Sequence, residues 1–516
     1  MTIRGCKIYP KNFIFATGII LRFMKRVFVG ICLYFSSSIL SGCDHLPSDI
    51  VVPDEEEMRN EYTEAIPIDF SYVGYRKGEA ELPSVRTIIT LEAPADGSDA
   101  TEMIQRAIDK VPAPGAVLLK AGEYRVGGKI SINRNGVVLR GEGEATRIVA
   151  TGTTQRTLMN MGVSTVRRLL AETAIVENAL AGQMWVRVDD PSVFAVGDRV
   201  SVCLAPNDLW ISDLKMDRIQ GDSEQWEASY FLMYWDREVT RLEGDKVWLD
   251  CPIVMDLEAR YAQKMALYKS DFDRIEESGI EDMFIVSEYD KTDIYDEDHA
   301  WTAISVSGAE NCWIRGVKSA HFGYALVSLN KLARCITVKD CISTAPISLI
   351  TGSRRYAFYI HQGQMCLFEN CLADEDRHGF ITGSRVPGPN VFLDCDMTNA
   401  HSVVGPHHRW ATGLLYDCCQ GGIRLEVNDR AHYGSGHGWP AVNCVFWNCT
   451  AEKVECQSPW ISGKNWCIGT IGEKHQQVNY WDGLVRPDGE WLSPGVHVEP
   501  RSLYRQQLNN RLKNGK

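Results

Sequence analysis

The sequence predicts an all-β fold of the β-solenoid kind, in which short strands stack turn upon turn. One phrase returns five times, with an apolar residue three places before a cysteine and Asp or Asn directly before it. The five cysteines are 30, 24, 23 and 31 residues apart, and self-similarity at a period of about 20–50 residues is typical of solenoids. Upstream, short apolar runs alternate with Gly and Asn turns, as stacked strands require. The phrase ends at Cys341, Cys371, Cys395, Cys418 and Cys449.

Both fixed positions of the phrase have structural explanations. Strand alternation turns the apolar residue inward, and Asp or Asn tolerates the left-handed backbone that a sharp corner needs. One cysteine per coil predicts a column of small buried thiols. None of the 14 cysteines beyond the first 43 residues forms the C-x-x-C pair typical of zinc sites. Export would favour disulfides, so a few bridges stay open as an alternative.

Residues 1–43 predict a targeting leader. After Lys25 and Arg26 comes the apolar run 27–35, and then Leu-Ser-Gly-Cys at 40–43. This order resembles a bacterial lipoprotein signal, whose lipidated cysteine would be Cys43. The resemblance implies export, with a membrane-anchored lipoprotein in the periplasm or at the cell surface of a Gram-negative bacterium. A single spanning helix is the alternative, but charges and serines interrupt the apolar residues.

The next segments predict a tether and then the first coils. Residues 44–85, with an acidic run at 54–57, are expected to form a polar tether. Residues 86–166 are expected to hold the N-terminal rungs of the coil. Asp99 is placed to cap a helix at 100–111. Short strands are expected at 115–119, 122–126, 129–132 and 137–143.

This opening resembles that of the pectate-lyase-like superfamily. The matching motifs are Asp-Gly-Ser-Asp-Ala-Thr at 96–101, Gly-Ala-Val-Leu-Leu-x-x-Gly-x-Tyr at 115–124 and Val-Leu-Arg-Gly-Glu-Gly at 138–143. Members are right-handed parallel β-helices, mostly polysaccharide lyases and glycoside hydrolases. The resemblance implies this fold, with the helix capping its N-terminal end, and a carbohydrate-active enzyme.

Three further regions follow. Between 167 and 275 the rhythm stops, and strand patterns there predict an inserted β-rich subdomain. Its aromatic-rich segment 210–235 is expected to be a loop that either stacks on sugar rings or forms a local core. The main β-helix is expected at 276–470, and residues 471–516, with a helix near 501–508, are expected to cap its open end.

The segments between the repeated phrases carry the candidate chemistry. Seven of the chain's 12 histidines lie between His361 and His437. Stacking makes residues one period apart neighbours, and His378, His407 and His437 are 29 and 30 residues apart. These three are therefore expected along one groove over residues 355–439. A solvated face with scattered charges is the structural alternative.

The residue types favour β-elimination in a uronic-acid polysaccharide. That reaction needs a cation at the sugar carboxylate, which Arg supplies by bidentate pairing, and a base and an acid, for which His or Tyr is suited. The Trp residues are expected to stack on sugars, or else to be buried between loops. The predicted catalytic residues are His407, Arg409, His437, His378, Arg430 and Arg377, and the predicted substrate-binding residues are Trp410, Trp439, His408, Glu426, Asn428 and Arg355.

Other functions stay open. Hydrolysis would need two carboxyl groups about 5–9.5 Å apart, from Asp374, Asp376, Glu426 and Asp429. The tripeptide Gly-His-Gly at 436–438 resembles one of polygalacturonase-type hydrolases, but their paired-Asp and Arg-x-Lys motifs are not found at comparable spacing. A third reading is a non-catalytic glycan-binding lipoprotein. No cofactor is required, although calcium at Asp374 and Asp376 is kept as an alternative.

The net charge limits which kinds of partner the protein can bind. The formal net charge of −13 argues against nucleic acid, which needs a basic face. A local basic cleft can still bind an anionic substrate on an acidic protein. The expected partner is a polysaccharide or oligosaccharide, with the membrane reached only through the lipid anchor. A lyase is favoured over a hydrolase, because the segments hold more Arg and His than unexplained carboxylates.

Overall fold

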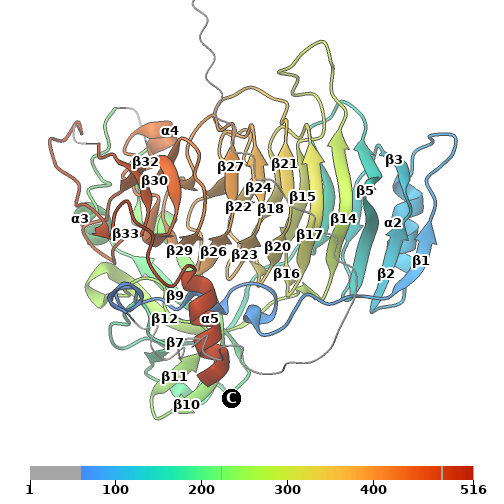
Figure 1. Cartoon of the computed structure of the whole chain (residues 1–516). Coiled ribbons are helices and arrows are strands. Elements are labelled where there is room, and N and C mark those ends of the chain that lie inside the picture. The colour runs from blue at the N-terminus through green and yellow to red at the C-terminus, as the bar shows by residue number, and fades with distance from the viewer. Residues whose placement is uncertain (1–59, 222–223, 478–479, 515–516) are drawn as a thin grey trace, which may run out of the picture. The chain divides into compact units, whose positions relative to one another are not determined.

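The computed structural model describes residues 60–221, 224–477 and 480–514. Its main feature is a coil of parallel strands, which Figure 1 shows stacked in chain order from blue to red. Strand-to-strand crossovers of this kind are right-handed, and the predicted right-handed parallel β-helix is confirmed. The central sheet, sheet A, holds β1 (Thr87–Leu91), β2 (Gly115–Leu119), β5 (Val137–Ala150), β14 (Gly279–Ser287), β17 (Trp313–Ala320), β20 (Thr337–Lys339), β23 (Leu367–Glu369), β26 (Asn390–Leu393), β29 (Ala411–Asp417), β31 (Ala441–Trp447), β33 (Trp466–Ile468) and β35 (Glu490–Leu492).

After sheet A, each coil turns through further strands before it returns. Sheet B, on which the candidate site is built, consists of β4 (Ile130–Ile132), β6 (Thr157–Gly162), β15 (Thr302–Ser307), β18 (Ala325–Leu329), β22 (Phe358–Ile360), β25 (Phe380–Thr382) and β28 (Gly405–Pro406). The remaining coil strands are β3 (Gly122–Val126), β21 (Ile342–Thr344), β24 (Leu372–Asp374) and β27 (Asp396–Thr398) beside sheet A, β13 (Ile275–Glu276), β16 (Ala309–Glu310) and β19 (Ala333–Arg334), and β30 (Arg424–Val427), β32 (Thr450–Cys456) and β34 (Ile471–Lys474).

The interior of the coil is a set of side-chain ladders. Phe368 stacks on Phe392 with ring centroids 5.0 Å apart, and Phe392 stacks on Tyr416 at 4.9 Å. Such offset aromatic pairs add to the free energy gained by burying their area. All 14 cysteines of the described residues are free thiols, and 13 of them are buried, so the prediction of buried free thiols is confirmed for every repeat except that of Cys418.

The fourth repeat is one residue out of the predicted register. Tyr416, and not Leu415, pairs with Phe392 and fills the interior. Cys418 therefore takes the left-handed corner, at φ 56°, that Asp394 and Asn448 occupy in other coils. Cys419 joins the thiol column instead, with Sγ 3.3 Å from the carbonyl oxygen of Phe392. The predicted register was wrong here because two cysteines are adjacent, and the one that follows Asp417 is not the one that turns inward.

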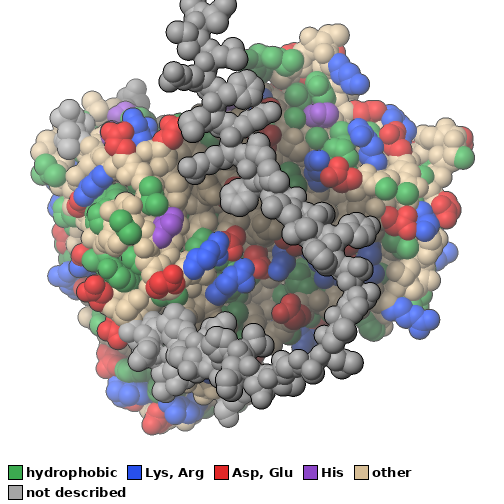
Figure 2. All heavy atoms as spheres, in the orientation of Figure 1, with side chains coloured by type: hydrophobic (Ala, Val, Ile, Leu, Met, Phe, Trp, Pro, Cys, Tyr) green, Lys and Arg blue, Asp and Glu red, His purple; other side chains and the backbone are tan. Residues whose placement is uncertain are grey.

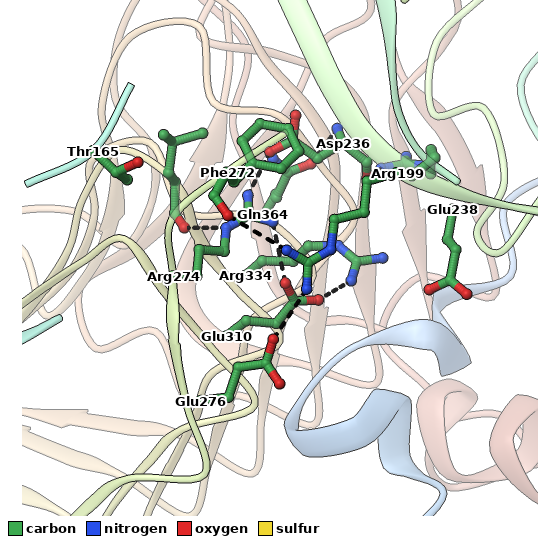
Figure 3. A network of polar contacts seen from close by, with 12 residues as sticks. Thr165, Arg199, Asp236, Glu238, Phe272, Arg274, Glu276, Glu310, Arg334 and Gln364 are labelled. Carbon is green, nitrogen blue, oxygen red and sulfur yellow. Dashed lines mark hydrogen bonds and ion pairs between the residues drawn. The ribbon is translucent and has the colours of Figure 1, made fainter. Parts of the chain in front are cut away.

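The predicted insertion is a separate antiparallel sheet. Its strands run in the spatial order β7 (Arg168–Ala174), β12 (Ala262–Asp271), β9 (Arg199–Pro206), β10 (Met233–Glu243), β11 (Lys246–Leu249) and β8 (Trp185–Arg187). The segment expected as a loop contains α3 (Asp208–Asp213), and Trp210, Trp226 and Phe231 are buried together there. Because these side chains are buried, the segment forms a local core and does not stack on sugar rings. A buried network of Arg and acidic side chains ties the insertion to the coil (Figure 3).

Two terminal predictions need correction. Residues 60–85 are no polar tether, because Ile66, Ile68 and Phe70 are buried against the outer face of sheet A, beyond α1 (Glu61–Glu64). The C-terminal helix is present as α5 (Leu503–Asn514), but it packs on the side of the coil, where the Tyr504 amide donates to Asp417 at 2.8 Å. Both segments cover apolar side chains that sheet A turns outward.

The predicted helix at the start of the coil is present. The expected helix is α2 (Thr101–Lys110), with Ile104, Ala107 and Ile108 buried in the coil's core, and the Thr101 amide donates to Asp99 at 2.7 Å. The leader with Cys43 lies outside the described residues, so lipidation and export stay predictions. Within residues 60–221, 224–477 and 480–514, no helix is both long and apolar enough to span a membrane.

Candidate functional site

The structure brings the three histidines that the sequence spacing had singled out into one row, with their rings in edge contact. The ring centroid of His407 lies 4.6 Å from that of His378 and 5.0 Å from that of His437. His408 joins them at 4.9 Å from His437, and Tyr356 lies 5.5 Å from His378. We call His378, His407, His408 and His437 the histidine cluster.

Sheet B positions this cluster. Thr382 pairs with Pro406, so His407 opens the turn that leaves β28 in the coil after β25. His378 precedes β25 in the same stack, and its Nδ1 lies 2.7 Å from the carbonyl oxygen of Val403. His437 follows the short turn α4 (Tyr433–Gly436), whose amide-to-carbonyl bond from His437 to Tyr433 closes it.

The glycines around His437 have a structural role. Gly436 has a φ of 82° and Gly438 a φ of 55°, which other residues adopt at a cost. A Cβ at Gly436 would lie 2.4 Å from the carbonyl oxygen of Glu224, and one at Gly438 would meet Met216 at 2.4 Å. The Gly-His-Gly tripeptide is therefore explained by close contact with the insertion, and it gives no separate support to a hydrolase.

Burial keeps the imidazoles neutral. It lowers the pKa of His408 to about 4 and that of His437 to about 3, helped by neighbouring Arg and His charges. The pKa values of His378 and His407 are also lowered, first by burial and then by the charges of Arg377 and Arg430 respectively. At neutral pH these rings are therefore uncharged and can accept a proton.

Polar atoms without partners are concentrated here. A buried polar atom that lacks a hydrogen bond costs about 1–3 kcal/mol, so natural proteins contain few. Their gathering at one place makes this the candidate site for a polar ligand. Within the described part of the chain, the unpartnered buried atoms at this site are His378 Nε2, His407 Nδ1, His408 Nδ1, His437 Nδ1, Arg377 Nη1, Arg430 Nε and Asn428 Oδ1.

The predicted arginines differ in how far they are engaged. Arg409 donates through Nη2 to the carbonyl oxygen of Ser435 at 2.6 Å and pairs with Glu224 at 2.7 Å. Arg430 pairs with Glu426, whose carboxylate Arg424 also contacts at 3.3 Å. Arg377 makes no ion pair with any described residue. It is thus the guanidinium most available to a carboxylate of the substrate.

Three predicted substrate-binding residues are corrected. Trp410 and Trp439 are both 0% exposed, and their indole N–H groups donate to Met255 Sδ at 3.4 Å and to the carbonyl oxygen of Leu214 at 3.2 Å. They bind the insertion to the coil and cannot stack on a sugar. Arg355 is 5% exposed and donates to the carbonyl oxygen of Ser348 at 2.7 Å, so it holds a loop.

Most of the candidate carboxylates already form structural hydrogen bonds or ion pairs. Asp374 accepts hydrogen bonds from Thr398 and Asn399, and Asp429 is fully buried against Arg486 at 2.8 Å. Asp376 differs, because burial raises its pKa to about 7 and its Oδ2 has no partner among the described residues. No three His, Cys, Asp or Glu side chains of the described ranges are grouped to hold a metal ion.

Tyr230 and Arg385 complete the site and were not foreseen. Tyr230, from the insertion, has its hydroxyl 3.2 Å from Ser384 Oγ, with the Arg385 guanidinium 3.9 Å and that of Arg409 5.5 Å from its ring centroid. Burial alone would raise the pKa of this phenol, but hydrogen bonds with Ser384 and Arg409 and the charge of Arg385 lower it. The only sequence signal was the aromatic-rich segment, which gave no link to a turn some 150 residues later.

The fold and this site together define the class of protein. The chain is a right-handed parallel β-helix with a His- and Arg-rich site over sheet B. No family model matches the chain, and no curated protein matches its sequence.

Solved structures with a similar fold come from several sources. The tailspike protein gp49 from Pseudomonas phage LKA1 is 14% identical over 72% of this chain, with a TM-score of 0.44, and this chain spans 57% of its length. The polygalacturonase from Erwinia carotovora ssp. carotovora is 13% identical, covering 81% of this chain and 98% of its own, with a TM-score of 0.35. The Azotobacter vinelandii mannuronan C-5 epimerase AlgE6 A-module is 12% identical, covering 79% and 98%, with a TM-score of 0.34. These are likenesses of fold.

Proposed function

We propose that this protein is a polysaccharide lyase that cleaves a glycan containing uronic acid by β-elimination. The observation that carries the proposal is the histidine cluster, whose neutral rings have unpartnered nitrogens beside an uncommitted guanidinium. Proton abstraction next to a carboxylate needs this pairing of a base and a cation. Of the four candidate carboxylates, all described by the structure, Asp374, Glu426 and Asp429 are already bonded, and this favours elimination over hydrolysis.

The residues divide the reaction between them. Arg377 pairs with the sugar carboxylate and stabilises the negative charge that develops when the C5 proton leaves. His407 takes that proton, because its ring is neutral and central in the cluster. Electrons of the C5–H bond form the C4–C5 double bond, the C4–O bond breaks, and Tyr230 donates a proton to the departing oxygen. Arg409 holds Tyr230 and the turn before His437 in place.

Hydrolysis is the second candidate, and one observation favours it. Asp376, with a pKa raised to about 7, is protonated often enough near neutral pH to act as a general acid. It would need a second carboxylate, and Asp374, Glu426 and Asp429 are each already bonded.

The product distinguishes these reactions. Purified protein would be incubated with a panel of plant, algal and host polysaccharides, and the release of ultraviolet-absorbing, unsaturated uronide would be followed together with reducing ends. We expect both signals to rise together on at least one uronic-acid polymer. Reducing ends without new absorbance would replace the lyase by a hydrolase, and binding with neither signal would leave a glycan-binding protein.

The pH dependence should be unusual for a histidine base. An ordinary imidazole would be half protonated near pH 6.5, but burial lowers the pKa of the proposed base His407 well below that, as it lowers the pKa of His408 to about 4 and that of His437 to about 3. Because the base form persists above the lowered pKa, kcat/KM should stay level from pH 7 to pH 5 and fall only below that. A fall centred near pH 6.5 would contradict the assignment, and a fall above pH 7 would indicate Asp376 as the acid.

A further inference from the structure

The turn that follows sheet B recurs from coil to coil, and the histidine cluster takes His407 and His408 from its last copy, after β28. His407 and Arg409 follow β28, Ser384 and Arg385 follow β25, and His361 follows β22. Earlier copies follow β18, β15, β6 and β4. A ligand that reaches the cluster can therefore continue along the earlier turns.

Two cavities lie along these earlier turns. The nearer, about 340 Å³, is lined by Arg385 and Gln362 of the coil and by Tyr234 of the insertion. The farther, about 710 Å³, is lined by Lys129, Asn160 and Ser307, among others. Lys331 lines both cavities, which together we call the path. Arg385 links this path to Tyr230, whose ring also contacts Arg409, the residue after His408.

The charges along the path are of one sign. None of the described residues that line either cavity is Asp or Glu. Lys129, Lys331 and Arg385 make no ion pair with any described residue, and Arg385 Nε is buried without a partner. Arg167 also lines the path, but Asp236 neutralises it at 2.7 Å. We call Lys129, Lys331 and Arg385 the basic track.

Such a track is unusual on this protein. The chain carries 67 acidic against 54 basic residues. On the face drawn in Figure 2, Lys and Arg side chains are interspersed with Asp and Glu. A path with free cations and no carboxylate is thus a local inversion of the protein's charge, and a focused positive potential attracts an anionic chain.

A row of neutral polar groups crosses sheet B at Asn330, the residue before Lys331. Asn330 donates to Ser305 Oγ at 2.9 Å and accepts from Ser328 Oγ at 3.1 Å, and its Oδ1 lies 3.2 Å from His361 Nδ1. These side chains come from β15, β18 and the turns after β18 and β22, so they run across the strands of sheet B in the same direction as the basic track. Hydroxyl, amide and imidazole groups that stand in a row suit the hydroxyls of successive sugars.

We infer that the basic track binds an extended anionic glycan, several sugars long, and leads it to the histidine cluster. From β28 to β4 sheet B has six strand spacings, or about 29 Å at 4.8 Å each. Only the cleavage reaction at the end of the track rests on the proposed function. Single-stranded nucleic acid fits less well, because it needs aromatic platforms for its bases, and Tyr234 is the one aromatic residue among the described lining residues.

Charge removal tests the track. Lys129 and Lys331 would both be changed to Gln, and the matched control would change Lys110 and Lys291, which are exposed and lie outside both cavities. All proteins would also carry His407→Gln, so that turnover does not consume the probe. Binding would be measured by titration with polygalacturonate, with dextran and poly(U), at several salt concentrations. We expect the Lys129/Lys331 variant to bind polygalacturonate roughly tenfold more weakly, with a shallower salt dependence, and the control to be unchanged.

Each result bears on the inference separately from the reaction. Equal binding by the two double variants, or equal binding of dextran and polygalacturonate, would overturn it. Tighter binding of poly(U) than of polygalacturonate would replace the glycan by nucleic acid. If wild-type protein releases no unsaturated product yet shows this charge-dependent binding, the proposed reaction fails while the track stands.

Discussion

Replacing His407 with Ala is expected to lower kcat/KM on the uronic-acid substrate by about 10³-fold, the range of a lost proton-transfer group. His407 is the centre of the cluster, in ring contact with His378, His408 and His437. Arg409→Ala should abolish turnover as well, because the Arg409 side chain fixes Ser435 before His437 and lies over Tyr230. The rates would be measured from the ultraviolet absorbance of the product.

His401→Ala is the matched control for these variants. His401 is exposed and lies in the same stretch, but its ring is not part of the cluster. Since His407 is buried, each variant would be checked for an unchanged thermal unfolding midpoint, and His407→Gln would test the ring with a polar replacement. Near-wild-type activity in both His407→Ala and Arg409→Ala would remove this site from the mechanism.

The period of the coil made the centre of the site predictable. His378, His407 and His437 are close because one coil separates each from the next, and a separation of 29 or 30 residues is visible in a single sequence. The Asp and Asn corners were predictable for a similar reason, since a left-handed corner restricts the residue type at one position per coil.

What the insertion contributes could not be predicted in this way. Tyr230 meets Arg385 and Arg409 through the packing of one sheet against another, which no local period records. The same packing buries Trp410 and Trp439, whose place beside basic residues suggested sugar contact. A Trp side chain gains as much from a core as from a sugar face, and its neighbours in sequence do not tell the two apart.

The insertion reaches the site only if it is held against the coil, and a buried ion network does this (Figure 3). Arg274 pairs with Asp236 of β10 at 2.5 Å and with Glu310 of β16 at 3.2 Å. Arg334 of β19 pairs with Glu310 and, at 2.5 Å, with Asp250 after β11. The network therefore joins strands of the insertion to strands of the coil.

Removing one member should be costly. Arg334→Met leaves Glu310 and Asp250 short of a buried partner, and breaking such a pair destabilises a protein by about 3–5 kcal/mol. The free energy of unfolding would be obtained from denaturant titration followed by fluorescence. The control is Arg168→Met, since Arg168 pairs with Asp271 and Asp273 at the surface, where ion pairs contribute about 0–1 kcal/mol. Equal stability of the two variants would show that the network contributes no more than a surface pair.

The same network predicts how stability depends on acid. Burial alone would raise the pKa of Asp236, but Arg167 and Arg274 lower it to about 2, and Arg334 likewise lowers the pKa values of Asp250 and Glu310. Because these folded-state values lie below the unfolded ones near 4, the stabilisation is complete above about pH 4 and is lost as the pH falls toward 2. Wild-type protein should therefore lose more stability between pH 5 and pH 3 than Arg334→Met, in which part of that contribution is already missing. Parallel losses in the two proteins would mean that the buried carboxylates are not held ionised by Arg334.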